Sequence, residues 1–162
     1  MKNFQAFNGV VTMIDDFSVG QNNEAGCYKL FSVDDGYGAS VNFVVAPTTY
    51  FVDHVMMELG DRVTGFYDAD APVPLIYPPQ FRALVMARDT AYQSVKVDYF
   101  NRQLESRDGT LRLNISPYTR ILLENGQAFT GSIANRNLIV VYGATTRSIP
   151  AQTTPSTIIV MC

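Results

Sequence analysis

The sequence predicts an all-β protein built of two similar units. Segments rich in Val, Ile, Phe and Tyr, bounded by Gly, Pro and Asp, recur along its 162 residues. Residues 41–53 (VNFVVAPTTYFVD) are similar to residues 111–123 (LRLNISPYTRILL), which lie 70 positions later. Residues 61–87 are similar to residues 136–162 at an offset of 75, with no gap inside the block. A repeat of this length indicates one structural unit used twice.

Two pairs of residues anchor this repeat. Pro47 falls on Pro117 in the first block, and Val85 falls on Val160 in the second. The change of offset from 70 to 75 indicates one insertion in the second unit. The two expected units are residues 1–90 and 91–162.

Five segments of the first unit have the composition of strands. They are residues 7–17, 27–33, 39–53, 62–67 and 81–88. Pro47 lies in the middle of the third segment, and because proline cannot donate to a ladder it predicts a bend, a bulge or an edge. Residues 53–59 predict a single helical turn or a loop. The proline-rich connection 71–79 (APVPLIYPP) is expected to run extended.

The second unit repeats this order with a shorter opening. Its expected strands are residues 94–100, 111–123, 137–142 and 157–161, and residues 104–106 are expected to continue the first of them. The Asp108–Gly109 and Asn125–Gly126 pairs are typical of tight turns. Residues 148–155 (SIPAQTTP) correspond to the proline-rich connection of the first unit. We expect Leu75, Tyr77 and Ile149 in these connections to point inward and cover the core.

This pattern favours a small barrel in each unit. The first unit has about five short strands and the second has four or five. One short helical element is expected, between the third and fourth strands of the first unit, and there is no strand–helix–strand alternation. Closing such a sheet removes the edge strands that an open sheet would have to protect. The nearest match in strand number and helix position is the OB fold, so two tandem OB-like β-barrel units are expected. A pair of small β-sandwich domains is the alternative.

The end of the second unit also resembles a known group of proteins. Residues 142–155 (YGATTRSIPAQTTP), followed by STIIVM, resemble a repeated ending of uncharacterised bacterial, clostridia-type proteins, some secreted, that carry OB-like barrel units. The resemblance is most specific over residues 147–155, and it implies a bacterial β-barrel protein without implying an activity. The first unit has VPLIYPP in the corresponding stretch and no arginine at the place of Arg147.

Charge is distributed unevenly along the chain. The formal net charge is −3, with −6 in residues 1–90 and +3 in residues 91–162. The two halves can therefore attract each other, within one chain or between chains, so a homo-oligomer or a protein partner is expected. An acidic total disfavours general nucleic-acid binding. With 47% hydrophobic and 17% charged residues, the chain has the composition of a folded protein.

No metal, cofactor or catalytic set is expected. One histidine, His54, and two cysteines, Cys27 and Cys162, cannot build a four-ligand zinc site without several carboxylates. A disulfide between the cysteines and two separate thiols are equally consistent with the sequence. The glycines near residue 36 are not followed by a helix, so they form no dinucleotide loop. Asp53 directly precedes His54 and faces away from it on a strand, which disfavours a Ser-His-Asp set. We therefore expect a protein that is not an enzyme.

The N-terminal segment gives no targeting signal. It contains one lysine and no apolar core of the secretory type, and no apolar run approaches the roughly 18 residues of a membrane span. These features predict a cytoplasmic protein without a membrane partner.

Arginines interleaved with tyrosines give the second unit a candidate binding surface. Aromatic rings flanked by arginine stack on and neutralise single-stranded nucleic acid or another anionic ligand. The candidate ligand-binding residues are Tyr99, Arg112, Tyr118, Arg120 and Arg147. Small barrels also use aromatic residues to pack their cores, and this structural role carries more weight than ligand binding. The sequence therefore predicts a non-enzymatic binding or assembly module, with binding of single-stranded nucleic acid or an anionic ligand by the second unit as the alternative.

Overall fold

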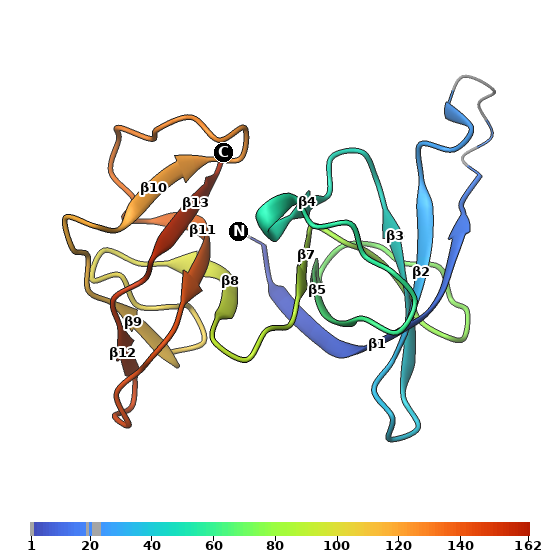
Figure 1. The fold of residues 1–162 in the computed structure, drawn as a ribbon, viewed down its shortest axis with the longest axis horizontal. Coiled ribbons are helices and arrows are strands. Elements are labelled where there is room, and N and C mark those ends of the chain that lie inside the picture. The colour runs from blue at the N-terminus through green and yellow to red at the C-terminus, as the bar shows by residue number, and fades with distance from the viewer. Residues whose placement is uncertain (1, 19, 21–23) are drawn as a thin grey trace. The chain divides into compact units, whose positions relative to one another are not determined.

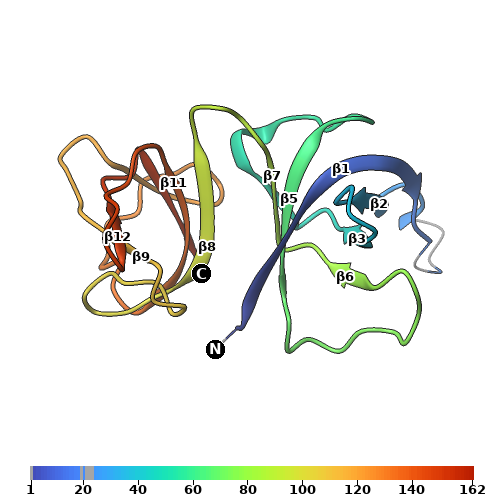
Figure 2. The same ribbon diagram turned by 90° about the horizontal axis from the view of Figure 1, so that it is seen from below.

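The protein is all-β, as expected. The computed structural model describes residues 2–18, 20 and 24–162, and their strands form two compact units. Unit one comprises Lys2–Asp89 and unit two Thr90–Cys162. Figures 1 and 2 trace the strands of each unit from two directions.

The strands of unit one form one seven-stranded sheet. They are β1 (Phe4–Asp16), β2 (Lys29–Asp34), β3 (Ser40–Val45), β4 (Tyr50–Phe51), β5 (Arg62–Asp68), β6 (Gln80–Arg82) and β7 (Val85–Arg88). Their hydrogen-bonded order is β4-β7-β5-β1-β2-β3-β6. Only a short break separates β3 from β4 in the chain, and likewise β6 from β7. One end of the order pairs β3 with β6 and the other end pairs β4 with β7, so both ends join the same two chain segments. In both places, β3 with β6 and β4 with β7, the two segments run parallel.

A turn at Pro47 divides the strand that the sequence predicts over residues 39–53. The Thr49 N–H donates to the Ala46 carbonyl oxygen (3.0 Å) and closes the turn. The buried Thr49 hydroxyl accepts from the Ala46 N–H (3.0 Å) and donates to the Ala83 carbonyl oxygen (2.8 Å). The turn lets the chain change its partner from β6 to β7. The 3₁₀ turn η2 (Val52–His54) follows β4, where a helical turn or a loop is expected.

Unit two uses shorter strands. They are β8 (Ser94–Phe100), β9 (Leu111–Leu113), β10 (Arg120–Leu123), β11 (Arg136–Tyr142), β12 (Ala151–Thr153) and β13 (Thr157–Met161). They form a four-stranded sheet, β10-β13-β11-β8, and a pair, β12-β9. Residues 104–106 do not continue a strand. They make only two isolated bridges, Phe100 with Ser106 and Glu105 with Arg112, which link β8 to β9.

The turn at Pro117 has the same hydrogen bonds as the turn at Pro47. The Thr119 N–H donates to the Ser116 carbonyl oxygen (3.1 Å), and the Ser116 N–H donates to the Thr119 hydroxyl (3.3 Å). The Thr119 hydroxyl donates to the Pro155 carbonyl oxygen (2.8 Å). Each proline is thus the second residue of a turn that a threonine ties to the last connection of its unit.

The alignment of the last strands differs from the sequence expectation. Phe66 pairs with Val85 in unit one, whereas Val141 pairs with Thr157 in unit two. Phe66 and Val141 lie 75 positions apart, but Val85 and Thr157 lie only 72 apart. Val85 therefore corresponds to Thr157 and not to Val160. The connection before the last strand is three residues shorter in unit two, and alternating apolar residues in both last strands hide this difference.

Each unit has its own hydrophobic core. In unit one the buried core residues come from β1, β2, β3, β5 and β7, together with Met57 and Ala83. In unit two they come from β8, β9, β11 and β13. Alternation along the strands sends every second side chain inward, so several strands of each unit contribute side chains to its core.

The expectation that Leu75, Tyr77 and Ile149 cover the cores is wrong. Their exposed fractions are 101%, 81% and 96%. In unit one the base of the loop is already closed, because the Tyr67 ring stacks on the Phe81 ring with 3.9 Å between centroids and 12° between planes. The stacked rings occupy the core volume at the base of the loop, so the side chains of the loop have none to fill.

Candidate functional site

The candidate site is the connection between β5 and β6, residues 69–79, which we name the β5–β6 loop. The chain leaves β5 just after Tyr67 and re-enters β6 at Phe81, and the stacked rings of these two residues fix the base of the loop. Phe43 packs against both rings, with centroid distances of 6.2 Å and 6.5 Å. Figure 2 shows the wide loop that leads into β6.

The loop carries a run of exposed apolar side chains. Four of them are classed as large exposed hydrophobic residues, namely Val73, Leu75, Ile76 and Tyr77. Four prolines stand among them, at positions 72, 74, 78 and 79. Proline restricts the backbone of a segment that has no ladder of its own, and the entropy lost on fixing this surface is correspondingly small. A contiguous exposed apolar segment of this kind marks a contact surface for another molecule.

Carboxylates stand at the start of the loop. One carboxylate oxygen of Asp68 accepts the N–H groups of Asn3 (3.1 Å) and Asp70 (3.0 Å), which shapes the turn out of β5. Asp70 is exposed. The apolar surface therefore has an acidic border, in a unit whose net charge is −6.

The five residues predicted to bind a ligand are spread over unit two. Tyr99 lies on β8, Arg112 on β9 and Arg120 on β10, whereas Tyr118 lies in the Pro117 turn and Arg147 in the loop before β12. Tyr118 and Arg120 are close in the chain. The three arginines and Tyr118 are exposed, and Tyr99 is half-buried.

Tyr99 lines a shallow cleft of about 470 Å³. Its hydroxyl donates to the Asn135 side-chain oxygen at 3.4 Å. The other lining residues are Asn135, Arg136, Asn137, Met161 and Cys162. None of the other four predicted residues lines this cleft, so within unit two the prediction does not define one pocket.

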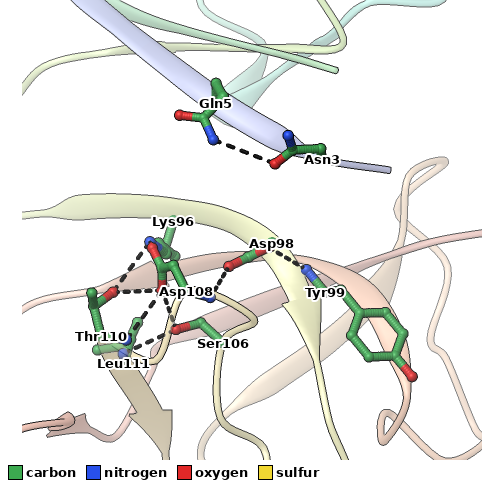
Figure 3. Close-up of polar contacts among 9 residues, drawn as sticks. All are labelled: Asn3, Gln5, Lys96, Asp98, Tyr99, Ser106, Asp108, Thr110 and Leu111. Atoms are coloured by element: carbon green, nitrogen blue, oxygen red, sulfur yellow. Dashed lines mark hydrogen bonds and ion pairs between the residues drawn. The ribbon is translucent and has the colours of Figure 1, made fainter. Parts of the chain in front are cut away.

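A polar network joins β8 to the turn before β9 (Figure 3). Lys96 forms an ion pair with Asp108, and its ammonium also donates to the Thr110 hydroxyl (3.3 Å). The Ser106 hydroxyl donates to Asp108 (2.6 Å). The Asp108 N–H donates to the buried carboxylate of Asp98 (3.2 Å). Because Ser106 is 3% exposed, its hydroxyl is not available to a substrate, and the network serves to hold the turn.

The same network sets the electrostatics of this end of unit two. Burial alone would raise the pKa of Asp108, but hydrogen bonds from Lys96, Ser106 and Thr110 outweigh burial and hold that pKa well below its ordinary value. Burial, and then the negative charge of Asp108, raise the pKa of the Tyr142 hydroxyl. Asp108 is therefore a persistent anion of the folded protein at neutral pH.

His54 lies on the surface of unit one. Its ring contacts the Tyr50 ring edge to face at a centroid distance of 5.9 Å. Its backbone and that of Asp53 have positive φ values of 51° and 62°. Across the described part of the chain, no group of three or more His, Cys, Asp or Glu residues is placed to hold a metal ion. Cys27 and Cys162 are free and exposed, so they do not form a disulfide.

No protein-family model, curated protein or solved structure matches this chain significantly. In the residues that the structure describes, every helix is too short or too polar to traverse a bilayer. Function is therefore inferred from the residues and their geometry.

The β5–β6 loop is the candidate surface whose exposure was predicted wrongly from the sequence. Its apolar residues suggested an inward orientation. The signal that could have corrected this is the density of prolines: four in residues 71–79 leave few N–H donors for a ladder and favour an excursion away from the sheet.

Proposed function

We propose that the protein is a non-enzymatic assembly module, built of two OB-type barrel units that repeat one motif. The OB assignment is supported by the closed order of the unit-one ladder and by the parallel pairing of its third and last chain segments. The repeat is supported by the identical Thr49 and Thr119 turns.

The observation that carries the assembly function is the exposed β5–β6 loop. Burying Leu75, Ile76 and Tyr77 against a partner would contribute about 1.5–3 kcal/mol for each large side chain. These side chains alone do not reach the roughly 1,000 Å² of a stable interface, so the contact is weak and concentration-dependent.

The occupant of this surface is a second copy of the chain. The loop belongs to the unit with net charge −6, whereas unit two has net charge +3. Unit two also exposes apolar side chains near its arginines, Tyr118 beside Arg120 and Ile149 beside Arg147. Unit one of one copy therefore complements unit two of the next in both charge and apolar character. Such a head-to-tail contact produces rings or short chains of molecules.

Sedimentation velocity over a range of protein concentrations tests this function. The wild-type chain is expected to show a mass that rises with concentration, and the rise is expected to weaken as salt screens the charges. The double variant Leu75→Asp, Tyr77→Asp is expected to stay monomeric. Tyr37→Asp is the matched control, because Tyr37 is also exposed in unit one but lies in the β2–β3 turn. A wild-type chain that remains a monomer at every concentration contradicts the proposal.

A further inference from the structure

The outer face of the β9–β12 pair carries a second set of binding groups. In this parallel pair Arg112 lies opposite Gln152, and Leu113 lies opposite Thr153. Leu111, Leu113 and Thr153 are each 3% exposed and point inward. Alternation along the strands therefore sends four polar side chains to the outer face. These are Arg112, Asn114, Gln152 and Thr154.

Three of these side chains line a cleft of about 460 Å³. The volume lies in the range of roughly 300–1,000 Å³ that is typical of small-ligand sites. The full lining is Asn114, Ala144, Thr145, Thr146, Gln152, Thr153 and Thr154. Apart from Ala144 and the inward-pointing Thr153, the lining residues carry neutral hydroxyl or amide side chains. No carboxylate and no aromatic ring is among them.

The walls of the cleft are fixed to each other before any ligand arrives. The Thr146 N–H donates to the Gln152 carbonyl oxygen, and the Gln152 N–H donates to the Thr146 hydroxyl, both at 2.9 Å. The Thr153 hydroxyl donates to the Ala144 carbonyl oxygen (2.8 Å). Because the loop wall is tied to β12 in this way, little conformational entropy is lost on binding.

The two amides retain hydrogen-bonding capacity. The Asn114 side-chain NH₂ donates to the Gln152 side-chain oxygen at 3.2 Å, which uses one donor of the first amide and aligns the pair. An amide offers two donors and an acceptor oxygen, so the pair can still both donate to and accept from a ligand. The hydroxyls of Thr145 and Thr154, both exposed, add groups that donate and accept. Such a surface exchanges hydrogen bonds with the hydroxyl groups of a sugar.

Arg112 adds a cation beside these neutral groups. Glu105 is paired opposite it on its other side, and Arg147 follows Thr146 in the loop wall. Arg112 lies next to Gln152 across the pair and two residues before Asn114 on the same face. Its planar guanidinium is suited to bind a carboxylate through two parallel hydrogen bonds. We propose that this face of unit two binds an acidic saccharide, with ring hydroxyls in the cleft and a carboxylate on Arg112. Single-stranded nucleic acid fits this cleft less well, because the lining has no aromatic ring on which a base could stack.

Unit one does not duplicate this site. At the corresponding ladder position Asn42 lies opposite Gln80. The Asn42 side-chain oxygen accepts a hydrogen bond from the Ser32 hydroxyl (2.6 Å). In unit one the cation of this face is Arg82, two residues after Gln80, and not a residue at the position of Arg112. The arrangement of amides and arginine in unit two is therefore not reproduced, and one saccharide site per chain is expected. This inference does not depend on the assembly function, which uses the β5–β6 loop of unit one and the exposed Tyr118 and Ile149 of unit two with their neighbouring arginines.

Isothermal titration calorimetry on the full chain tests the proposal. The probes are trigalacturonate, maltotriose as a neutral sugar, and an oligothymidylate with the same number of charges. Trigalacturonate is expected to bind with one site per chain and more tightly than the other two. Arg112→Gln and Asn114→Ala are each expected to weaken that binding at least about tenfold, the loss of a charge-assisted or ligand hydrogen bond. Arg102→Gln, which removes an exposed arginine of the same unit that does not line the cleft, is expected to leave it unchanged.

Several outcomes would overturn the site. One is no binding of trigalacturonate. Another is equal binding of maltotriose, which would remove the role of Arg112, and a third is equal or tighter binding of the oligothymidylate, which would indicate a nucleic-acid surface. A loss of affinity in Arg102→Gln as large as in Arg112→Gln would show a general effect of charge. Circular dichroism of each variant checks that the fold is unchanged.

Discussion

Gly65 shows how one residue sets the packing of unit one. It lies on β5 directly against the Phe43 ring, and a Cβ atom placed on it would come within 2.5 Å of two ring carbons. Its φ is not in the left-handed region, so the glycine is needed for space and not for backbone conformation. Its absent side chain lets the Phe43 ring occupy the core.

Gly65→Ala is expected to lower the free energy of unfolding by about 1–3 kcal/mol, because the added methyl group forces the Phe43 ring to move. Urea denaturation followed by circular dichroism measures the change. Gly143→Ala is the matched control, since a Cβ atom there would lie 3.6 Å from its nearest neighbour, an ordinary contact. Equal stability of the Gly65 variant and the wild type would show that the core adapts freely.

The threonine hydroxyl of each proline turn is a second determinant at the residue scale. Thr49→Val removes a hydroxyl that is buried and makes two hydrogen bonds, so the Ala46 N–H and the Ala83 carbonyl each lose a partner. The expected loss of stability is about 1–3 kcal/mol. Thr119→Val should cost less, because its bond from the Ser116 N–H is longer, at 3.3 Å. Chemical denaturation of both variants, with Thr49→Ser as the control that keeps the hydroxyl, checks this order.

Asp108 links stability to pH. Its pKa in the folded protein is lowered from the ordinary value of 3.8, so the unfolded chain takes up a proton at this residue more readily than the folded one. Its contribution is therefore fully present above pH 3.8 and is lost as the pH falls toward the folded-state pKa. Because the side chain is 45% exposed, solvent screening keeps this contribution modest.

Asp108→Asn is expected to be less stable than the wild type at pH 7, and the difference is expected to shrink as the pH falls below 3.8. Denaturation curves at both ends of this range provide the measurement. A difference that stays constant with pH would mean that only the neutral hydrogen bonds of Asp108 matter.

At the scale of elements, the β5–β6 loop separates two kinds of apolar residue. Phe81 at its base packs on Tyr67 and is a partly buried residue that contacts the core, whereas Leu75 and Tyr77 are exposed. A core contact stabilises the fold, but an exposed apolar side chain does not, whatever its role in binding.

Leu75→Ser and Tyr77→Ser are expected to change the free energy of unfolding by no more than about 0.5 kcal/mol. Phe81→Ala is expected to cost about 2–4 kcal/mol, because it leaves a cavity beside Phe43 and Tyr67. Thermal and urea unfolding of the three variants compare them. Large destabilisation by either serine substitution would restore the idea that the loop covers the core.

At the scale of the whole molecule, the two units differ more in their surfaces than in their strand order. Unit one presents an acidic border and an apolar loop, and unit two presents exposed arginines and a polar cleft. Two units with such different surfaces suit a protein that contacts two different partners, and the partners we propose are a second copy and a saccharide.

Both cysteines are expected to react as free thiols of the folded chain. Cys27 is in unit one and Cys162 in unit two, and both are exposed and unpaired with each other. Titration with Ellman's reagent without denaturant is expected to give two thiols per chain. A value near zero that rises only after reduction would show a disulfide.

Local sequence determined the strand content and the turns of this protein. Alternating and β-branched segments gave most strands near the expected positions, because these patterns need no partner to be visible. The exception is β12, which lies in residues 148–155, where the sequence predicts a connection. Pro47 and Pro117 likewise predicted interruptions that the structure contains, since proline cannot donate to any ladder. Of the proposed saccharide site, the sequence predicted Arg112 as a candidate binding residue but not Asn114 or Gln152, because neutral amides carry no distinctive sequence pattern.

Only the tertiary structure decided register and exposure. Val85 and Val160 look equivalent in sequence, but the pairing partners of β7 and β13 show that the alignment is shifted by three residues. The local sequence does not reveal this shift, because the strands that pair with β7 and β13 lie far from them in the chain. Leu75, Tyr77 and Ile149 are apolar, yet they are exposed because other side chains already fill the cores. Composition states which side chains favour burial, whereas the finite volume of each core decides which of them are buried.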